Sequence, residues 1–186
     1  MSPVRPIAKL NALPTDDAEA VLREVCGSRT WTRAVASARP FADASALHYA
    51  AEKAWDELAH ADWLEAFAAH PRIGEDRRVS GADASAWARS EQAGLAASPE
   101  SERSELLEAQ RAYELRFGWP YIVCATGRTA PEMLADCLMR VARAPADEIA
   151  TAAGEERQIG RLRLVKLLAD LEFTADGEST PTGGDR

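Results

Sequence analysis

One histidine of this chain shares a helical face with two aromatic side chains. Trp63, Phe67 and His70 are spaced i, i+4 and i+7, which places the three side chains on the same side of a helix. An imidazole gains or loses a proton near neutral pH, so it suits acid–base catalysis. The alternative, which position alone favours, is a buried histidine satisfied by a hydrogen bond or one that caps the helix before Pro71.

A carboxylate interrupts a second apolar stripe. Trp87, Glu91 and Leu95 are spaced i, i+4 and i+8, so Glu91 lies between two apolar neighbours, and Gln92 adds an amide beside it. A carboxylate in such a place loses hydration unless a cation or several hydrogen-bond donors face it. The alternative, favoured for a lone glutamate, is a side chain that turns to solvent from a half-buried face.

In the last long helical pattern, Arg161 and Arg163 lie on different faces. Arg163 lies between Ile159 and Leu167 on one stripe, whereas Arg161 stacks with Arg157 on a basic stripe. We therefore predict that Arg163 points inward and that Arg161 is solvated. An inward arginine needs a carboxylate or an anionic ligand. A structural ion pair in the core is an equally open alternative to an anion-binding role.

The motifs of several other chemistries are missing. The chain has no HExxH, and His48, His60 and His70 lack metal-ligand spacing. It has no GxGxxG, GxxxxGK[ST] or GxSxG motif for nucleotides or a serine nucleophile. These absences disfavour a metal-dependent hydrolase and leave acid–base and electrostatic chemistry without metal or cofactor. The acidic pairs Asp56–Glu57 and Glu155–Glu156 are interpreted from their spacing as solvated helix charges.

Composition restricts the class of protein further. With 186 residues the chain suits one domain, and its formal net charge of −8 comes without a run of Lys and Arg, so no nucleic-acid partner is expected. No apolar run approaches the ~18 residues of a membrane span. Cys26, Cys124 and Cys137 form no CxxC pair and are interpreted as small buried hydrophobes in a reducing compartment. The first residues lack the apolar region of a secretory signal, which also favours a cytoplasmic location.

Capping residues and prolines predict a chain of helices. Thr15, Ser28 and Asp43 are predicted N-caps, and Gly27 is predicted to end the first helix as a C′ glycine. The proline-containing residues 1–14 are expected to be extended. The next helix, expected at 62–70, must end before Pro71.

The second half of the chain continues the helical pattern. Ser98 followed by Pro99 predicts a helix start, and Gly118 predicts its stop. The apolar residues 119–125 are expected to be extended or a buried turn. Residues 174–186 are poor in apolar side chains, so a disordered tail is expected. Other expected segments are a polar loop at 71–82 and helices near 87–95, 131–142 and 146–172.

Several segments, read in order, resemble one enzyme family. They are CGSRTW (26–31), AFAAHPRIGE (66–75), SEQAGL (90–95), YELRFGWPYIVCATGRT (113–129) and IGRLRL (159–164). Together they resemble the decarboxylases of 2-oxo-4-hydroxy-4-carboxy-5-ureidoimidazoline (OHCU), over roughly residues 8–172. The resemblance implies an all-α domain of seven to eight helices, which we place at 1–173. It also implies a homodimer without a cofactor that converts a small-molecule substrate, OHCU, into (S)-allantoin and carbon dioxide.

The resemblance also implies roles for particular residues. His70, Glu91 and Arg163 match the family's catalytic positions. Its substrate-binding positions are matched by Pro71, Ser90, Gln92 and the backbone of Tyr121, Ile122, Val123, Cys124 and Ala125. Loss of carbon dioxide leaves a carbanion that needs preorganised donors and one proton on one face. A coupled histidine and carboxylate titrate as a unit, which leaves open whether His70 or Glu91 holds that proton.

One rival interpretation keeps the same pocket without catalysis. A helical ligand-binding or regulatory protein could use His70, Glu91 and Arg163 to hold an anion. The absence of one of these residues would favour this rival, and all three are present. A turnover assay separates the two.

Overall fold

The computed structural model is built of helices. It describes residues 6–74, 87 and 98–173, which contain eight helices and no strand. The predicted all-α class is confirmed. The helices of the first half are α1 (Pro6–Ala12), α2 (Thr15–Val25), α3 (Arg29–Ser37), α4 (Ala44–Asp56) and α5 (His60–Ala68). Those of the second half are α9 (Glu100–Phe117), α10 (Ala130–Val141) and α11 (Pro145–Phe173).

Local signals set several of the helix ends. The Ser28 hydroxyl accepts from the Trp31 N–H at 3.3 Å, and an Asp43 carboxylate oxygen accepts from the Ala46 N–H at 2.9 Å. These two predicted N-caps are confirmed. Gly118 ends α9 in the left-handed conformation, with φ of 82°, which favours glycine. Its predicted role as a stop is confirmed as well.

The structure corrects the prediction for the N-terminal segment. Residues 6–12 form a helix rather than an extended entry, with Pro6 at its first position, where the missing proline N–H costs nothing. Ile7 and Leu10 of this helix are buried, so tertiary packing stabilises a helix where the prolines had favoured an extended chain. The N-cap of α2 is Pro14 rather than Thr15. The predicted disordered tail lies outside the described residues.

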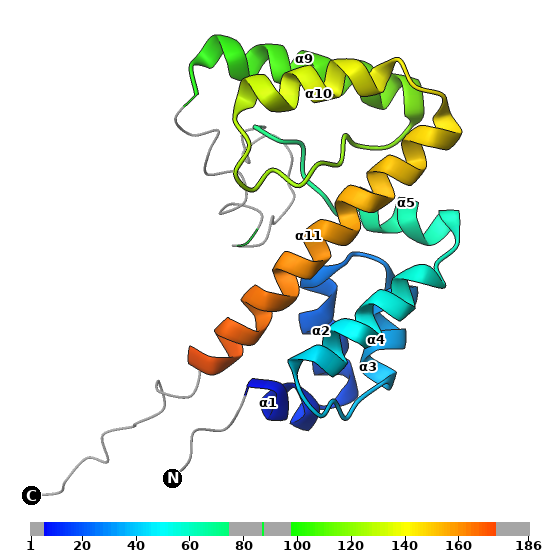
Figure 1. Ribbon diagram of the computed structural model, residues 1–186, viewed down its shortest axis with the longest axis vertical. Helices are drawn as coiled ribbons and strands as arrows, with labels where there is room; N and C mark the ends of the chain where they lie inside the picture. The colour runs from blue at the N-terminus through cyan, green and yellow to red at the C-terminus, as the bar shows by residue number, and fades with distance from the viewer. Residues whose placement is uncertain (1–5, 75–86, 88–97, 174–186) are drawn as a thin grey trace, which may run out of the picture.

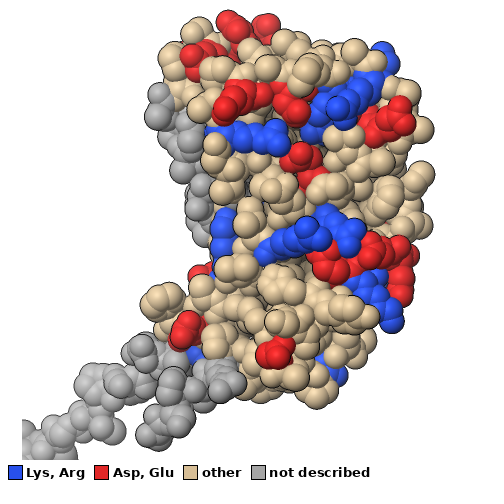
Figure 2. Space-filling view, viewed as in Figure 1, with Lys and Arg blue, Asp and Glu red and all other residues tan. Residues whose placement is uncertain are grey.

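The 29-residue helix α11 connects the two halves of the molecule (Figure 1). It packs against α1, α2, α4 and α5, whereas α9 and α10 lie side by side at its N-terminal end. Two clusters of buried side chains result, one shared by α1–α5 and α11 and the other between α9 and α10. Basic and acidic side chains lie beside one another on the visible face of the molecule (Figure 2).

Residues 121–125, which we call the wall segment, separate these clusters. Tyr121, Val123 and Ala125 pack into the α9–α10 cluster, whereas Ile122 and Cys124 pack into the cluster around α11. All five are at most 8% exposed. This alternation is the period-2 pattern of an extended segment, and none of it is in a helix. The segment is therefore packed on both sides, and of the two forms predicted for residues 119–125, extended or a buried turn, residues 121–125 take the extended one.

A buried ionic cluster fixes the wall segment in place. Arg140 of α10 is 1% exposed and its Nε donates to Glu148 of α11, which is fully buried, at 2.7 Å. Arg140 Nη1 donates to the Ile122 carbonyl at 2.8 Å, and its guanidinium lies 4.9 Å from the centre of the Tyr121 ring. The hydrogen bond to Glu148 raises the pKa of Arg140 above its usual value against the effect of burial. Arg140 thus joins α10, α11 and the wall segment.

Gly27 has a different role from the predicted one. It is not among the glycines with positive φ, so it does not end α2 as a left-handed C′ residue. Instead, a Cβ at Gly27 would lie 2.4 Å from the Cβ of Ala69 and 3.3 Å from the Ala66 carbonyl. Only glycine lets the α2–α3 connection approach the end of α5 so closely. This approach fixes the backbone one residue before His70.

The Gly27→Ala variant should therefore be less stable. The added methyl group must displace the α5 backbone or Ala69, and overpacking of this kind costs about 1–3 kcal/mol. Gly154→Ala in α11 is the matched control, because nothing lies within 4 Å of its added Cβ. That change should stabilise the helix by up to about 1 kcal/mol. Urea unfolding of both variants measures the difference, and equal midpoints would contradict the close-contact role of Gly27.

The Arg140→Met variant tests the ionic cluster. Removing one partner leaves Glu148 buried without its guanidinium, which costs roughly 3–5 kcal/mol. The double variant Arg140→Met/Glu148→Leu should recover much of that loss, because an apolar pair of similar volume needs no charge partner. Denaturant midpoints of the wild type, both single variants and the double variant decide this. Losses that simply add in the double variant would show that the two side chains do not stabilise each other.

Candidate functional site

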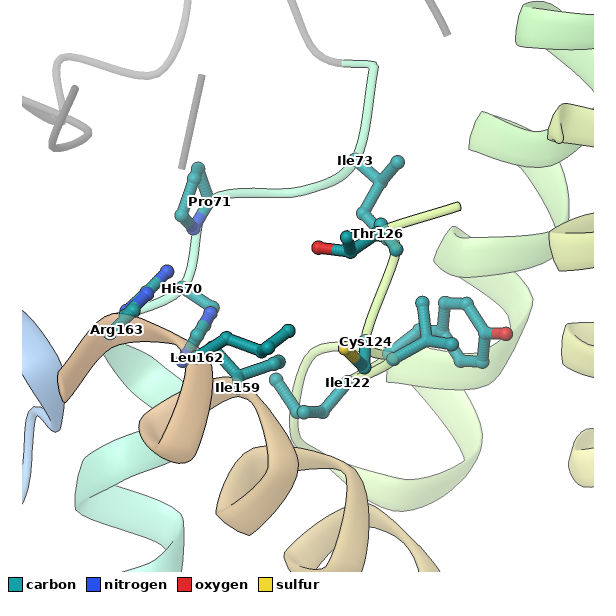
Figure 3. A pocket seen from close by; sticks show the side chains of 12 residues that line it. His70, Pro71, Ile73, Ile122, Cys124, Thr126, Ile159, Leu162 and Arg163 are labelled. Carbon is teal, nitrogen blue, oxygen red and sulfur yellow. The ribbon is translucent and has the colours of Figure 1, made fainter. Parts of the chain in front are cut away.

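A pocket forms where two chain segments meet helix α11 (Figure 3). The first is the chain after α5, with His70, Pro71 and Ile73. The second is the wall segment followed by Thr126, and α11 contributes Ile159, Leu162 and Arg163. One pocket is therefore lined by the predicted residues His70, Pro71 and Arg163 and by all five residues of the wall segment.

His70 lies just beyond α5 rather than inside it. The helix ends at Ala68, and the backbone N–H of His70 donates to the Phe67 carbonyl at 3.0 Å. The His70 side chain is 11% exposed, and its Nε2 lies 2.6 Å from a carboxylate oxygen of Glu156. The ring is thus directed at α11 and lines the pocket at the same time.

Glu156 is the functional candidate that sequence reasoning missed. It was interpreted as a solvated helix charge, and that interpretation is wrong, because the residue is 1% exposed. Its neighbour Glu155 is also engaged, and accepts the Cys124 N–H at 2.7 Å. A usable signal was present in the sequence. Glu156 precedes Arg163 by seven residues, which is two helical turns, so the stripe that predicted Arg163 inward contains Glu156 too.

Arg161 and Arg163 of α11 lie as predicted. Arg163 is 7% exposed, lines the pocket and donates from Nη1 to the Glu24 carbonyl at 3.4 Å. The Arg161 side chain is 55% exposed and binds the Glu52 carboxylate of α4 at 2.6 Å. That contact lowers the pKa of Glu52. The inward register of Arg163 is confirmed, whereas its role toward a ligand stays a prediction.

The backbone of the wall segment is only partly available to a ligand. The Cys124 N–H donates to Glu155, and the Ile122 carbonyl accepts from Arg140. Glu155 is further held by Arg128 Nη2 at 3.4 Å. These contacts tie the segment to α10 and α11 and fix its position. The Cys124 N–H therefore does not serve as a spare donor for negative charge in this structure.

Burial keeps the thiols of Cys26 and Cys137 neutral. Burial is the main cause that raises the pKa of Cys26, and the negative charge of Glu156 adds to it. Burial also raises the pKa of Cys137 to about 12. A thiol needs to ionise before it acts as a nucleophile or a metal ligand. The interpretation of these cysteines as buried hydrophobes is confirmed by their burial.

Three of the predicted site residues, Ser90, Glu91 and Gln92, lie outside the described residues. Over residues 6–74, 87 and 98–173, no group of His, Cys, Asp and Glu is arranged to hold a metal ion. Across the same ranges, no helix is long and apolar enough to cross a membrane.

Comparison with known proteins identifies relatives over most of the chain. The family model described as OHCU decarboxylase matches residues 11–165. The chain is 35% identical over 147 residues to the uric acid degradation bifunctional protein TTL of Arabidopsis thaliana. That match covers 78% of this chain and 45% of the plant protein, so the chain spans under half of that relative.

Two further comparisons extend over nearly the whole of the related protein. The 2-oxo-4-hydroxy-4-carboxy-5-ureidoimidazoline decarboxylase of Haloferax volcanii is 26% identical, with 86% of this chain and 94% of that protein covered. A crystal structure of an OHCU decarboxylase in the presence of (S)-allantoin superposes with a TM-score of 0.69. It is 33% identical, and the superposition covers 80% of this chain and 96% of that one.

Proposed function

Because the chain belongs to the OHCU decarboxylase family, we propose that it removes carbon dioxide from OHCU to give (S)-allantoin in urate degradation. In class terms it is a carboxy-lyase. The observation that carries the proposal is the meeting of His70 and Arg163 in one pocket, in a chain that the family model matches over residues 11–165. The first supplies an imidazole, which can donate or accept a proton, and the second a permanent positive charge.

The reaction needs a group that stabilises negative charge and a group that supplies a proton, and the pocket contains a candidate for each. The bond between the ring carbon and the carboxylate breaks, carbon dioxide leaves, and the electron pair stays on the substrate. The neighbouring carbonyl and imine nitrogen of the substrate delocalise this pair, so the chemistry requires no cofactor as an electron sink. A fixed cation such as Arg163 stabilises the developing negative charge, and it needs no reorganisation when placed in advance. A proton must then reach one face, which fixes the handedness of the product.

His70 is the proposed proton donor or part of the donor pair. Its ring lies at the edge of the pocket, and Pro71 sets the direction in which the chain continues. Glu91 is proposed to cooperate with it, and Ser90 and Gln92 to bind the substrate beside it. With Ile159 and Leu162 as apolar neighbours, the pocket excludes part of the water that would otherwise compete as a proton source.

We further propose that the protein acts as a homodimer in the cytoplasm and needs no metal. The dimer and the absence of a cofactor come from the family resemblance, and the location from the cysteine pattern. Exhaustive chelation should therefore leave turnover intact.

A turnover assay with freshly prepared OHCU tests the function directly. The protein should accelerate the loss of OHCU and give optically active allantoin, whereas spontaneous decay gives a racemic product. Ultraviolet absorbance follows the substrate and circular dichroism follows the handedness of the product. An unchanged decay rate with a racemic product would exclude the enzyme and favour a ligand-binding protein.

Arg161 and Arg163 of α11 provide a matched pair within that assay. Arg163→Ala should lower kcat by roughly 10²–10³, the usual loss when one preorganised donor to developing charge is removed. Arg161→Ala should stay near the wild-type rate, because Arg161 faces Glu52 and solvent. Thermal melts of both variants correct for any unfolded fraction. Equal losses would show that Arg163 does not act on the substrate.

A further inference from the structure

The buried carboxylate of Glu156 has no evident structural purpose. Within the described residues, its one charged partner at ion-pair distance is His70, at 2.6 Å. Removing a carboxylate from water is costly, and an apolar side chain of similar volume often stabilises a core equally well or better. The carboxylate at 1% exposure is therefore explained more readily by what it does to His70 than by what it does for packing.

The contact restricts the chemistry of the imidazole. The pair is in close ionic contact, although its angles are not those of a hydrogen bond. An unprotonated ring nitrogen would set its lone pair against a carboxylate oxygen at 2.6 Å, so Nε2 of His70 must carry a proton. This holds for the neutral ring as the Nε2–H tautomer and for the protonated ring. The nitrogen that can gain or lose a proton is then Nδ1. A polar partner at the other ring nitrogen sets the tautomer of many histidines that act in catalysis.

The surroundings of the pair support this assignment. Glu156 and Arg163 lie two turns apart on the same face of α11, and Arg163 lines the pocket beside His70. Cys26 lies close enough to be influenced by the charge of Glu156, and burial keeps its thiol neutral. The only charged form of a thiol is the thiolate, which has the same sign as the carboxylate, so Cys26 cannot replace His70 as a charged partner of Glu156.

We propose that Glu156 is a positioning residue: it holds His70 in the Nε2–H form and directs Nδ1 to exchange the proton with the substrate. The proposal deepens the decarboxylase function and rests on it for its catalytic consequence. The arrangement at Nε2 itself does not depend on any turnover, so the two can be tested separately.

The tautomer of His70 is measured by nitrogen-15 NMR. The experiment uses the full-length protein labelled at histidine, at a pH where the ring is neutral, with His70→Asn to assign the signal. The wild type should carry the proton on Nε2. Glu156→Gln offers an amide that can donate as well as accept, so the Nδ1–H form should become populated. A wild-type ring protonated on Nδ1 would overturn the proposal.

Kinetics with two substitutions test the catalytic consequence. Glu156→Gln and Glu156→Leu should each lower kcat by roughly ten- to a hundredfold, part of the contribution of a positioned acid or base. KM should change by less than about twofold, because Glu156 lies behind His70 and not in contact with the substrate. Thermal melts of both variants, with the rates compared at matched folded fraction, separate a loss of activity from a loss of stability.

Glu52→Gln is the control for the loss of a carboxylate that contacts α11. Glu52 binds Arg157 and Arg161 on the outer face of that helix, away from the pocket. This variant should keep both the wild-type kcat and the wild-type tautomer. Rates within twofold of the wild type in both Glu156 variants would overturn the proposal. If the wild type itself shows no turnover, the decarboxylase function fails, whereas the tautomer measurement still decides whether Glu156 positions His70.

Discussion

A charge buried on α11 is stable only where another segment of the chain brings it a partner, and the arrangement of the site depends on this constraint. Two buried glutamates of the helix, Glu148 and Glu156, and the half-buried Glu155 meet it in three ways. Glu148 binds Arg140 of α10, Glu155 binds the backbone of the wall segment, and Glu156 contacts His70. The contacts of Glu155 and Glu156 join α11 to segments that line the pocket, and that of Glu148 joins it to α10, where Arg140 holds the Ile122 carbonyl.

The same contacts explain how the pocket is held ready for its reaction. The wall segment has no regular secondary structure of its own, and it is fixed by the Ile122 carbonyl and the Cys124 N–H. His70 lies past the end of a helix, and its ring is held by Glu156. Side chains held in this manner need little rearrangement when charge develops on a substrate, which is the main physical requirement for electrostatic catalysis.

Those parts of the fold that depend on neighbouring residues could be predicted from the sequence. Ser28, Asp43 and Gly118 act within one helical turn of themselves, and all three take their predicted roles. The inward position of Arg163 follows from helical periodicity alone. The order of the motifs likewise indicated the family before any geometry was known.

The features that were missed depend on contacts between distant segments. Gly27 is needed because α5 passes close to it, and no local pattern reveals this. The burial of Glu156 depends on His70, which comes from another element and is far away in the sequence. Adjacent glutamates on an otherwise polar helix stretch are typical of a solvated face, so spacing alone favoured the wrong interpretation. Whether Glu156 is buried or solvated depends on the crossing of α11 with the chain after α5.

The central claim is that His70 acts on the substrate as one unit with the carboxylate behind it. A double-mutant cycle of kcat/KM for His70→Asn, Glu156→Gln and the combination, at matched folded fraction, measures this most directly. Residues that act together give non-additive losses, so the double variant should be no slower than His70→Asn alone. Losses that multiply in the double variant would show that Glu156 acts independently of His70, and would contradict the account.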